Sequence, residues 1–552
     1  MLLDAVNNAT GISLFFQSPA RQTGRRLDII NPMTESRKIA RSASLISFAT
    51  FISRILGFVR DVVIAGFFGA TGLSDTFFVA FRIPNLLREM FAEGSMSSAF
   101  IPVLTETRIK KGEEEARRLA RITFTFIIIV VGSICVAGII FAPVIVRVIA
   151  PGFTQPEQLA TTVLLTRIMF PFLLLVSLAA LTMGVLNVER VFFIPALSSA
   201  WFNIAIIFTI ILLSSHLSRP ILAVAIGVTV GGIVQYATQI PLYLRKGYTY
   251  GIDTNFRNEG LKRMAILVLP LTLGLAVSQI NIFVSTILAS FLPQGSIAYL
   301  YYSMRLIQFP VGIFGVAMGM AALPALSAHA AKGDMESLGK DFSSTLRLLF
   351  FITVPSMVGL IALRYPIVNL LFQRGEFDYT ATKGTAFALV FYSLGIWSMV
   401  GVRVVVVAFY SMQDTRTPVK VALLSLATNI ILSLLLMGPL KHGGLALANS
   451  VASGVNFSLL FYLLSRRIVS VEYRRVLTSF SKTLIASIIM GLTAWSILHG
   501  PLWRGNGEVL KKSLYLGGTI LLCAGIYFLF ALILKSEEVK TLFNMFRRSR
   551  KA

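Results

Sequence analysis

The most constraining feature of this chain is a series of long apolar stretches joined by short polar connections. A helix that spans a membrane needs about 20 mostly apolar residues, and the chain has fourteen stretches of roughly this kind. They are residues 43–67, 76–106, 122–150, 160–186, 192–214, 220–244, 264–291, 296–328, 345–370, 384–410, 419–437, 443–465, 483–499 and 513–534. Hydrophobic residues make up 55% of the 552 residues and charged residues only 14%. The sequence therefore predicts an all-α polytopic membrane protein with about 14 transmembrane helices.

The net charge of +25 is distributed unevenly among the connections. The connections on one side, together with both termini, hold 33 lysines and arginines, whereas those on the opposite side hold seven. Short cytoplasmic connections of membrane proteins are enriched in these residues. The asymmetry predicts that both termini are cytoplasmic, and it explains the positive charge without a nucleic-acid partner.

The sequence contains no motif of an ATP-driven or metal-dependent enzyme. The two cysteines, Cys135 and Cys523, lie in apolar stretches, and the four histidines lack metal-ligand spacing. Neither a P-loop nor an H-E-x-x-H pattern occurs. The longest connection, about twenty residues, is too short for a catalytic domain. We therefore expect a transporter, with no catalytic residues, no metal and no cofactor.

Motifs of the first half of the chain recur in the second half at an offset of about 221–226 residues. The recurring pairs are 82–106 with 305–328, 188–213 with 414–436, and 232–246 with 454–467. We therefore predict two six-helix lobes, residues 43–250 and 264–467. Because six is an even number, both lobes have the same topology, as in transporters built from parallel repeats.

Three segments lie outside this repeat. Residues 483–534 hold two further helices, which we expect at the periphery of the lobes. Residues 1–42 contain no long apolar run and are predicted to form a cytoplasmic N-terminal extension. Residues 535–552 carry six basic residues and are predicted to form a basic cytoplasmic tail.

Residues 54–106 carry charges at positions that the apolar pattern places inside the membrane. The charged residues are Arg54, Arg60, Arg82, Arg88, Asp61, Asp75, Glu89 and Glu93. A charge at membrane depth costs roughly 2.5–3.5 kcal/mol on insertion scales, so such residues usually face a bundle interior or a water-filled cavity. The residues expected to interrupt these helices are Gly57, Gly66, Gly69 and Pro84. Two interpretations stay open: internal salt bridges, or a site at which several arginines bind an anionic substrate.

Arg305 is the most informative charge of the second half, because no Asp or Glu occurs within residues 261–332. Its position in the repeat is close to that of Arg82, which puts it at the expected interface between the lobes. As a structural ion pair it needs a carboxylate of the other lobe, for which Asp75 and Glu93 are the candidates. As a ligand it suits phosphate, because its guanidinium is planar, permanently charged and able to bind in a bidentate manner.

Several motifs in these segments are specific. They are S-R-I-L-G-F-V-R-D at 53–61, D-T-F-F-V-A-F-R-I-P-N-L-L-R at 75–88, F-A-E-G-S at 91–95, A-F-I-P-V-L at 99–104 and M-R-L-I-Q-F-P-V-G-I-F-G-V-A-M-G at 304–319. The chain resembles the MurJ (MviN) family of lipid II flippases, of the MOP exporter superfamily, over roughly residues 36–535. The resemblance implies that Arg54, Arg60, Arg88 and Arg305 hold the diphosphate of lipid II and that Asp75 is an essential acidic position. We add Arg82 and Glu93 to the predicted substrate site.

The function implied by the resemblance is movement of lipid II, a polyprenyl-diphosphate-linked peptidoglycan precursor, across the bacterial inner membrane. Alternating access would carry its head group from the cytoplasmic to the periplasmic leaflet for cell-wall synthesis and cell shape. In the family, the last two helices help to form a groove for the polyprenyl tail. The expected partners are this precursor and membrane lipids, and peptidoglycan synthesis proteins stay open as partners.

The absence of a nucleotide motif indicates that a membrane potential or an ion gradient, of an unidentified ion, supplies the energy. Two alternatives stay open. A related MOP transporter would move another polyprenyl-diphosphate saccharide, whereas a cationic-drug exporter fits poorly because unpaired arginines would repel its substrate. From a different class, an intramembrane glycosyltransferase would act on the same lipid.

Overall fold

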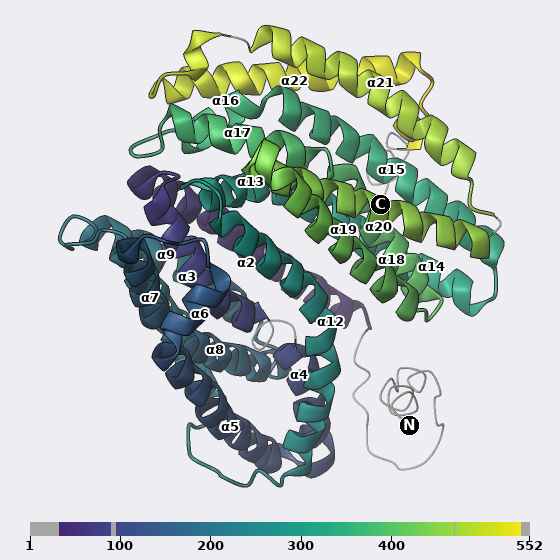
Figure 1. Ribbon diagram of the computed structural model, residues 1–552. Helices are drawn as coiled ribbons and strands as arrows, with labels where there is room; N and C mark the ends of the chain where they lie inside the picture. The colour runs from purple at the N-terminus through teal and green to yellow at the C-terminus, as the bar shows by residue number, and fades with distance from the viewer. Residues whose placement is uncertain (1–31, 90–94, 469, 499, 542–552) are drawn as a thin grey trace. The chain divides into compact units, whose positions relative to one another are not determined.

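The structure is a computed structural model that describes residues 32–89, 95–468, 470–498 and 500–541. Within these residues every regular element is a helix (Figure 1). A helix satisfies its backbone hydrogen bonds internally, as a chain surrounded by lipid instead of water requires. The prediction of an all-α membrane fold is confirmed. Glu93, most of the predicted N-terminal extension and most of the basic tail lie outside the described residues.

The first half of the chain contains ten described helices. They are α2 (Pro32–Phe68), α3 (Gly72–Arg88), α4 (Ser95–Lys111), α5 (Glu113–Ile140), α6 (Ala142–Ile149), α7 (Pro156–Met169), α8 (Pro171–Val188), α9 (Phe193–Leu213), α10 (Leu222–Ala237) and α11 (Ile240–Arg245). α2 begins within the predicted N-terminal extension, eleven residues before the apolar stretch. α5 likewise begins nine residues before its apolar stretch, because its first turns are charged but helical.

The second half begins with a long helix and repeats the same order. Its elements are α12 (Glu259–Ser290), α13 (Ser296–Pro310), the π-helical turn η3 (Val311–Gly315), α14 (Val316–Ala331), α15 (Met335–Ala362), α16 (Arg364–Phe372), α17 (Tyr379–Ser393), α18 (Ile396–Ser411), α19 (Arg416–Leu440) and α20 (His442–Arg467). α21 (Tyr473–Ile497), the short 3₁₀ turn η4 (Pro501–Trp503) and α22 (Val509–Ile533) follow.

The helix breaks of the two halves correspond. α5 and α15 are each 28 residues long, begin 222 residues apart, at residues 113 and 335, and are followed by the short helices α6 and α16. α7 and α8 are separated by one residue, and α17 and α18 by two, at the matching place. Such agreement is what a duplicated six-helix unit would produce, although the boundaries of the two lobes stay a prediction.

Ten helical segments of the described residues are long and apolar enough to cross a membrane, and the bent pair α17–α18 makes an eleventh. The other three predicted spans coincide with α2, with α3 and α4 together, and with α12. α2 carries charges in its middle, and residues 90–94 between α3 and α4 are outside the described chain. The number of 14 spans therefore stays a prediction.

The prediction that Gly57, Gly66 and Pro84 interrupt helices is wrong. α2 runs through both glycines, and α3 runs through Pro84. Gly57 makes room for a neighbour instead, because a Cβ added there would lie 3.2 Å from Nη2 of Arg305. Of the four expected interruptions only Gly69, with a φ of +63°, lies in a turn between helices.

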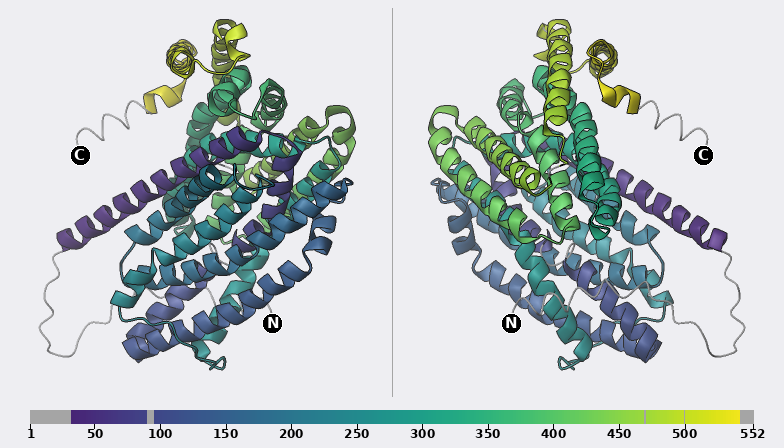
Figure 2. Two further views of the ribbon diagram at one scale, coloured as in Figure 1. Left: turned by 90° about the vertical axis from the view of Figure 1, so that its left-hand side faces the viewer. Right: turned by 90° about the vertical axis from the view of Figure 1, so that its right-hand side faces the viewer.

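α12 lies between the two halves, where it packs against α4 of the first half and α19 of the second (Figure 1). α21 and α22 pack against each other, α21 against α15 and α22 against α16. Both views of Figure 2 show this pair at one edge of the bundle, in yellow and yellow-green. Met490, Ala494, Trp503 and Tyr527 are buried there in a small apolar cluster that includes Phe351 of α15.

A partly buried carboxylate, that of Asp414, connects α18, α19 and α20 at the connection predicted to be cytoplasmic. Asp414 accepts hydrogen bonds from the backbone N–H (2.9 Å) and the hydroxyl (2.6 Å) of Thr417 in the first turn of α19. It also pairs with Arg467 at the end of α20. Burial alone would raise the pKa of Asp414, but the Thr417 hydrogen bonds and Arg467 outweigh it and lower the pKa to about 2.

The lowered pKa predicts a pH-dependent contribution to stability. In the unfolded chain the pKa is about 3.9, so the ionised carboxylate stabilises the folded state above about pH 4, and this contribution is lost as the pH falls toward 2. We expect Asp414→Asn to lower the free energy of unfolding by about 1–2 kcal/mol at pH 7. Thermal unfolding in detergent at pH 7 and pH 3 should show the difference shrinking at the lower pH. The exposed Asp341→Asn is the control, and an equal difference at both pH values would contradict the prediction.

Candidate functional site

Asp61 of α2 is the centre of a cluster of charges that joins the two halves. Its carboxylate is fully buried, and Nε and Nη2 of the adjacent Arg60 donate to its Oδ1 at 3.1 and 2.7 Å. Nε of Arg305, on α13, lies 2.6 Å from the other oxygen, Oδ2. This contact is an ion pair without hydrogen-bond geometry, since Oδ2 accepts no hydrogen bond. The hydroxyl of Tyr301 donates to Oδ1 at 3.3 Å.

The cluster keeps a positive charge, because one carboxylate faces two permanently charged guanidinium groups. Arg60 is held further by Asn203 of α9, whose Oδ1 accepts from Nη1 at 3.1 Å. Arg305 is less constrained: its side chain is 31% exposed, and among the described residues its guanidinium makes one hydrogen bond, a long one of 3.5 Å to Gln308. Several N–H groups of Arg305 are therefore free to bind an anion.

Two more arginines lie against the π-helical turn η3. Nη1 of Arg54, on α2, lies 3.8 Å from where a Cβ of Gly312 would be, and Cδ of Arg403, on α18, lies 3.2 Å from where a Cβ of Gly315 would be. Both arginines are exposed. Within the described chain neither has a carboxylate at ion-pair distance. π-helical turns are rare and frequently occur at functional sites, and glycines here let the arginines approach the backbone.

Arg82, another arginine of the predicted substrate site, lies on α3 and is partly buried. Its Nε is buried without a hydrogen-bond partner, and in the described part of the chain it makes no ion pair. Tyr301 and Tyr392 of the second half are close enough to interact electrostatically with it. Arg82 therefore faces the second half, near the tyrosine that binds Asp61.

Arg88 lies at the end of α3 in a different setting. Its Nε donates to Asn85 at 3.1 Å, and its guanidinium lies 3.8 Å from the carboxylate of Glu89. Glu89 in turn accepts from Gln279 of α12 at 2.6 Å. Among the described residues Arg88 thus pairs with Glu89, and Glu93, five residues later in the sequence, lies outside them.

Asp75 is not near the arginine cluster but at the end of the bundle formed by the turns 69–71, 291–295 and 373–378, which we call the outer end. It is 2% exposed, and its carboxylate accepts hydrogen bonds from the backbone N–H of Gly295 (2.6 Å) and Ala298 (2.8 Å). Gly295 and Ala298 begin α13, whose N-terminus carries a partial positive charge. Asp75 therefore caps a helix of the other half.

The outer end contains further contacts between the halves. The backbone N–H of Glu376 donates to the carbonyl of Gly66 at 2.9 Å. The backbone N–H of Gly152 donates to the hydroxyl of Ser290 at 3.1 Å. Glycine permits these close approaches: a Cβ at Gly152 would lie 2.3 Å from the carbonyl oxygen of Ser290. The two halves are thus in direct backbone contact at this end.

The structure corrects the predicted partner of Arg305. We expected Asp75 or Glu93, but the partner is Asp61, one helix away from Asp75. The sequence showed Asp61 as a charge within a predicted span but gave no role for it. Tyr301 was missed entirely, although a tyrosine one turn before Arg305 on the same helix face was a usable signal.

Comparison with known proteins identifies the family. The sequence model of the lipid II flippase MurJ family matches residues 64–508, most of the chain. The chain belongs to the MurJ family. Curated members similar to it include the probable lipid II flippases MurJ of Buchnera aphidicola (subspecies Schizaphis graminum) and Vibrio cholerae. The first is 36% identical over 500 residues, 90% of this chain and 96% of the relative. The second is 32% identical over 511 residues, 91% and 97% of the respective chains.

Solved structures show the same fold. The described chain is similar to a structure of lipid II flippase MurJ in an inward closed conformation, with a TM-score of 0.74 and 27% identity over 89% of this chain and 98% of that one. It is also similar to an inward-facing multidrug transporter of the MATE family, in the MOP superfamily, with a TM-score of 0.62. The two chains are only 14% identical, over 77% of this chain and 98% of the MATE transporter. The similarity to the MATE transporter therefore concerns the fold alone. The MurJ fold is a transporter fold, as we predicted.

Proposed function

We propose that this protein is a lipid II flippase, which moves the lipid-linked peptidoglycan precursor from the cytoplasmic to the periplasmic leaflet. The observation that carries the proposal is the positive cluster that Arg60 and Arg305 form around Asp61 between the two halves. A diphosphate is an anion that arginine binds well. Membership of the MurJ family supports this substrate over another polyprenyl-diphosphate saccharide, and it does not favour a glycosyltransferase.

The binding residues that we propose are the two arginines around Asp61 and those without an ion pair among the described residues. Arg305 and Arg60 would take one phosphate, and Arg54 and Arg82 would extend the positive surface. Arg403, which is not among the residues predicted from the sequence, joins this set because it lies beside η3 without an ion pair among the described residues. Arg88 remains a candidate. We no longer propose that Asp75 contacts substrate, because its carboxylate is occupied by backbone N–H groups.

The test is complementation of a bacterium depleted of its flippase. The wild-type chain should restore growth and normal cell shape, and labelled lipid II should appear in the outer leaflet. Restored growth without outward movement of lipid II would overturn the proposal. A chain that inserts into the membrane but restores neither growth nor the outward movement of lipid II would also overturn the proposal.

Energy coupling is proposed to come from the membrane potential or an ion gradient. One elementary charge that crosses 100 mV gains about 2.3 kcal/mol, enough to bias a charged transport cycle. In sealed proteoliposomes, transport should continue without ATP while a potential is kept, and should slow when an ionophore collapses that potential. Strict dependence on ATP would refute the prediction.

The proposed location is the bacterial inner membrane with both termini in the cytoplasm. Reporter fusions at Gly333, between α14 and α15, and at Gly375, between α16 and α17, should report the cytoplasm and the periplasm respectively. α15 and α16 together are long enough to connect the two sides. The same location for both reporters would exclude this topology.

A further inference from the structure

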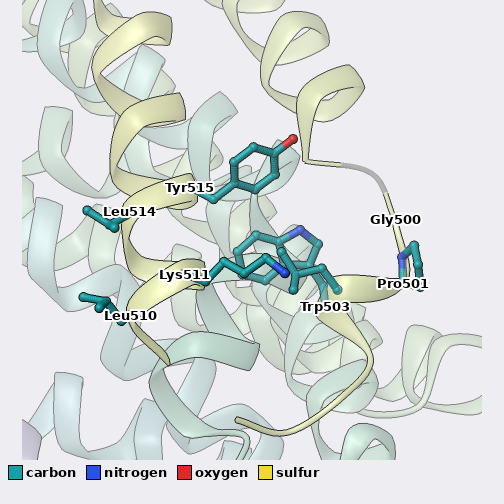
Figure 3. Close-up of a pocket in the computed structure, with 8 residues that line it drawn as sticks. Gly500, Pro501, Trp503, Leu510, Lys511, Leu514 and Tyr515 are labelled. Atoms are coloured by element: carbon teal, nitrogen blue, oxygen red, sulfur yellow. The ribbon is translucent and has the colours of Figure 1, made fainter. Parts of the chain in front are cut away.

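Lys512, in the first turn of α22, is a buried cation that the proposed transport site does not use. It is 3% exposed, and no carboxylate of the described residues lies within ion-pair distance. Its Nζ donates to Oδ1 of Asn369 at 2.9 Å and to the carbonyl of Gly505 at 2.6 Å. The preceding Lys511 differs: it is 68% exposed, pairs with Glu508, and lines an open pocket beside Trp503 (Figure 3).

A cation at this position is unfavourable on two counts. Burial removes the ammonium from water, and the N-terminus of α22 repels positive charge. A methionine would fill similar space without either cost. The role of Lys512 therefore lies in its hydrogen bonds, which an apolar side chain could not form.

Lys512 is one end of a chain of buried hydrogen bonds. Nδ2 of Asn369, on α16, donates to Oε1 of Gln373 at 2.7 Å and to the carbonyl of Trp503 at 3.0 Å. Nε2 of Gln373 donates to the carbonyl of Arg504 at 2.9 Å. Three consecutive carbonyls of the connection between α21 and α22 are thus bound by side chains that lead to Gln373.

Gln373 immediately precedes the turn that touches the other half. The backbone N–H of Glu376 donates to the carbonyl of Gly66, at the end of α2. Gly375 has a φ of +54°, and a Cβ there would lie 2.1 Å from the oxygen of Gly66. The turn 374–376 therefore fits against α2 only in a narrow range of positions, which its anchor at Gln373 helps to set.

We propose that Lys512 is a positioning residue through which the peripheral pair α21–α22 holds the turn 374–376 against α2. It stabilises the contact between the halves at the outer end. The consequence for transport rests on the proposed flippase function, because alternating access requires this contact to form and break. The contact itself can be measured without lipid II, so the two proposals fail independently.

The experiment uses the full chain with Cys135 and Cys523 replaced by alanine and a cysteine pair, Gly66→Cys and Arg374→Cys. These positions adjoin, because a Cβ at Gly66 would lie 3.3 Å from Cγ of Arg374. We expect Lys512→Met to lower the rate of disulfide cross-linking in membranes about tenfold, through the loss of buried hydrogen bonds. Lys511→Met, which removes the same charge next to it, should leave the rate unchanged. Equal rates in the parent and in Lys512→Met would overturn the proposal.

A second variant separates positioning from folding. Asn369→Asp keeps an acceptor for Lys512 and gives it a carboxylate, but it removes the N–H donors to Gln373 and Trp503. If Lys512 acts through this chain, Asn369→Asp should lower cross-linking as Lys512→Met does, while the melting temperature stays close to that of the parent. Cross-linking of Asn369→Asp at the parent rate would overturn the proposal. This result would count even if Lys512→Met fails to fold.

Discussion

Arg305→Ala is expected to abolish outward movement of lipid II while the protein still inserts and folds. The substitution removes the most available guanidinium of the Asp61 cluster, and a hydrogen bond to a charged group is worth about 1.5–3 kcal/mol. Head-group binding should therefore weaken about ten- to a hundredfold. Arg305→Lys should rescue only partly, because lysine keeps the charge but loses the planar fork. Lipid II binding and thermal stability, measured on the same purified variants, check this result.

The ion pair between Arg305 and Asp61 offers an alternative explanation for a loss of transport in Arg305→Ala. A second substitution at Asp61 tests this explanation. If Arg305 only neutralises Asp61, Arg305→Ala should lower stability with normal binding, and adding Asp61→Asn should restore function. If Arg305 binds substrate, the double variant should regain stability but not binding. Arg147→Ala, an exposed arginine near the end of a predicted span, is the matched control and should bind lipid II normally.

Asp75→Ala is expected to open the outer end and to stop transport through conformation, not through loss of binding. The change leaves the backbone N–H groups of Gly295 and Ala298 without an acceptor, at about 1–3 kcal/mol each when buried. Each 1.4 kcal/mol is a factor of ten, so the ratio of closed to open forms should fall at least about tenfold. Cross-linking of Gly72→Cys with Gln294→Cys, which face each other across this end, measures the ratio.

Asp378→Ala is the matched control for that experiment. Asp378 caps α17 by accepting from the backbone N–H of Ala381 at 2.7 Å, but both residues belong to the same half. Its loss should lower stability to a similar degree without changing the cross-linking rate. Unchanged cross-linking in Asp75→Ala, or an equal effect in Asp378→Ala, would show that Asp75 does not hold the halves together.

At the arginine site, the sequence left open which charges pair with one another. The sequence identified Arg305 as a cation without a local acidic partner, and the structure bears out that its partner comes from the other half. It offered Asp75 and Glu93 as candidates and not Asp61, because acidic residues at similar distances along the chain cannot be told apart without the packing. The choice follows from packing: Gly57 lets α13 approach α2, and Asn203 and Tyr301 complete the surroundings of Asp61.

The amino-acid sequence by itself determined the class of the protein, because apolar length and the scarcity of charge are local properties that each stretch carries alone. It also identified the arginines, which are permanent cations, that lie within predicted spans. The tertiary structure decided what those charges do. Contacts such as Asp75 with the start of α13, or Lys512 with Asn369, join residues more than a hundred positions apart. They depend on how helices approach one another, and no periodicity within a single helix contains that information.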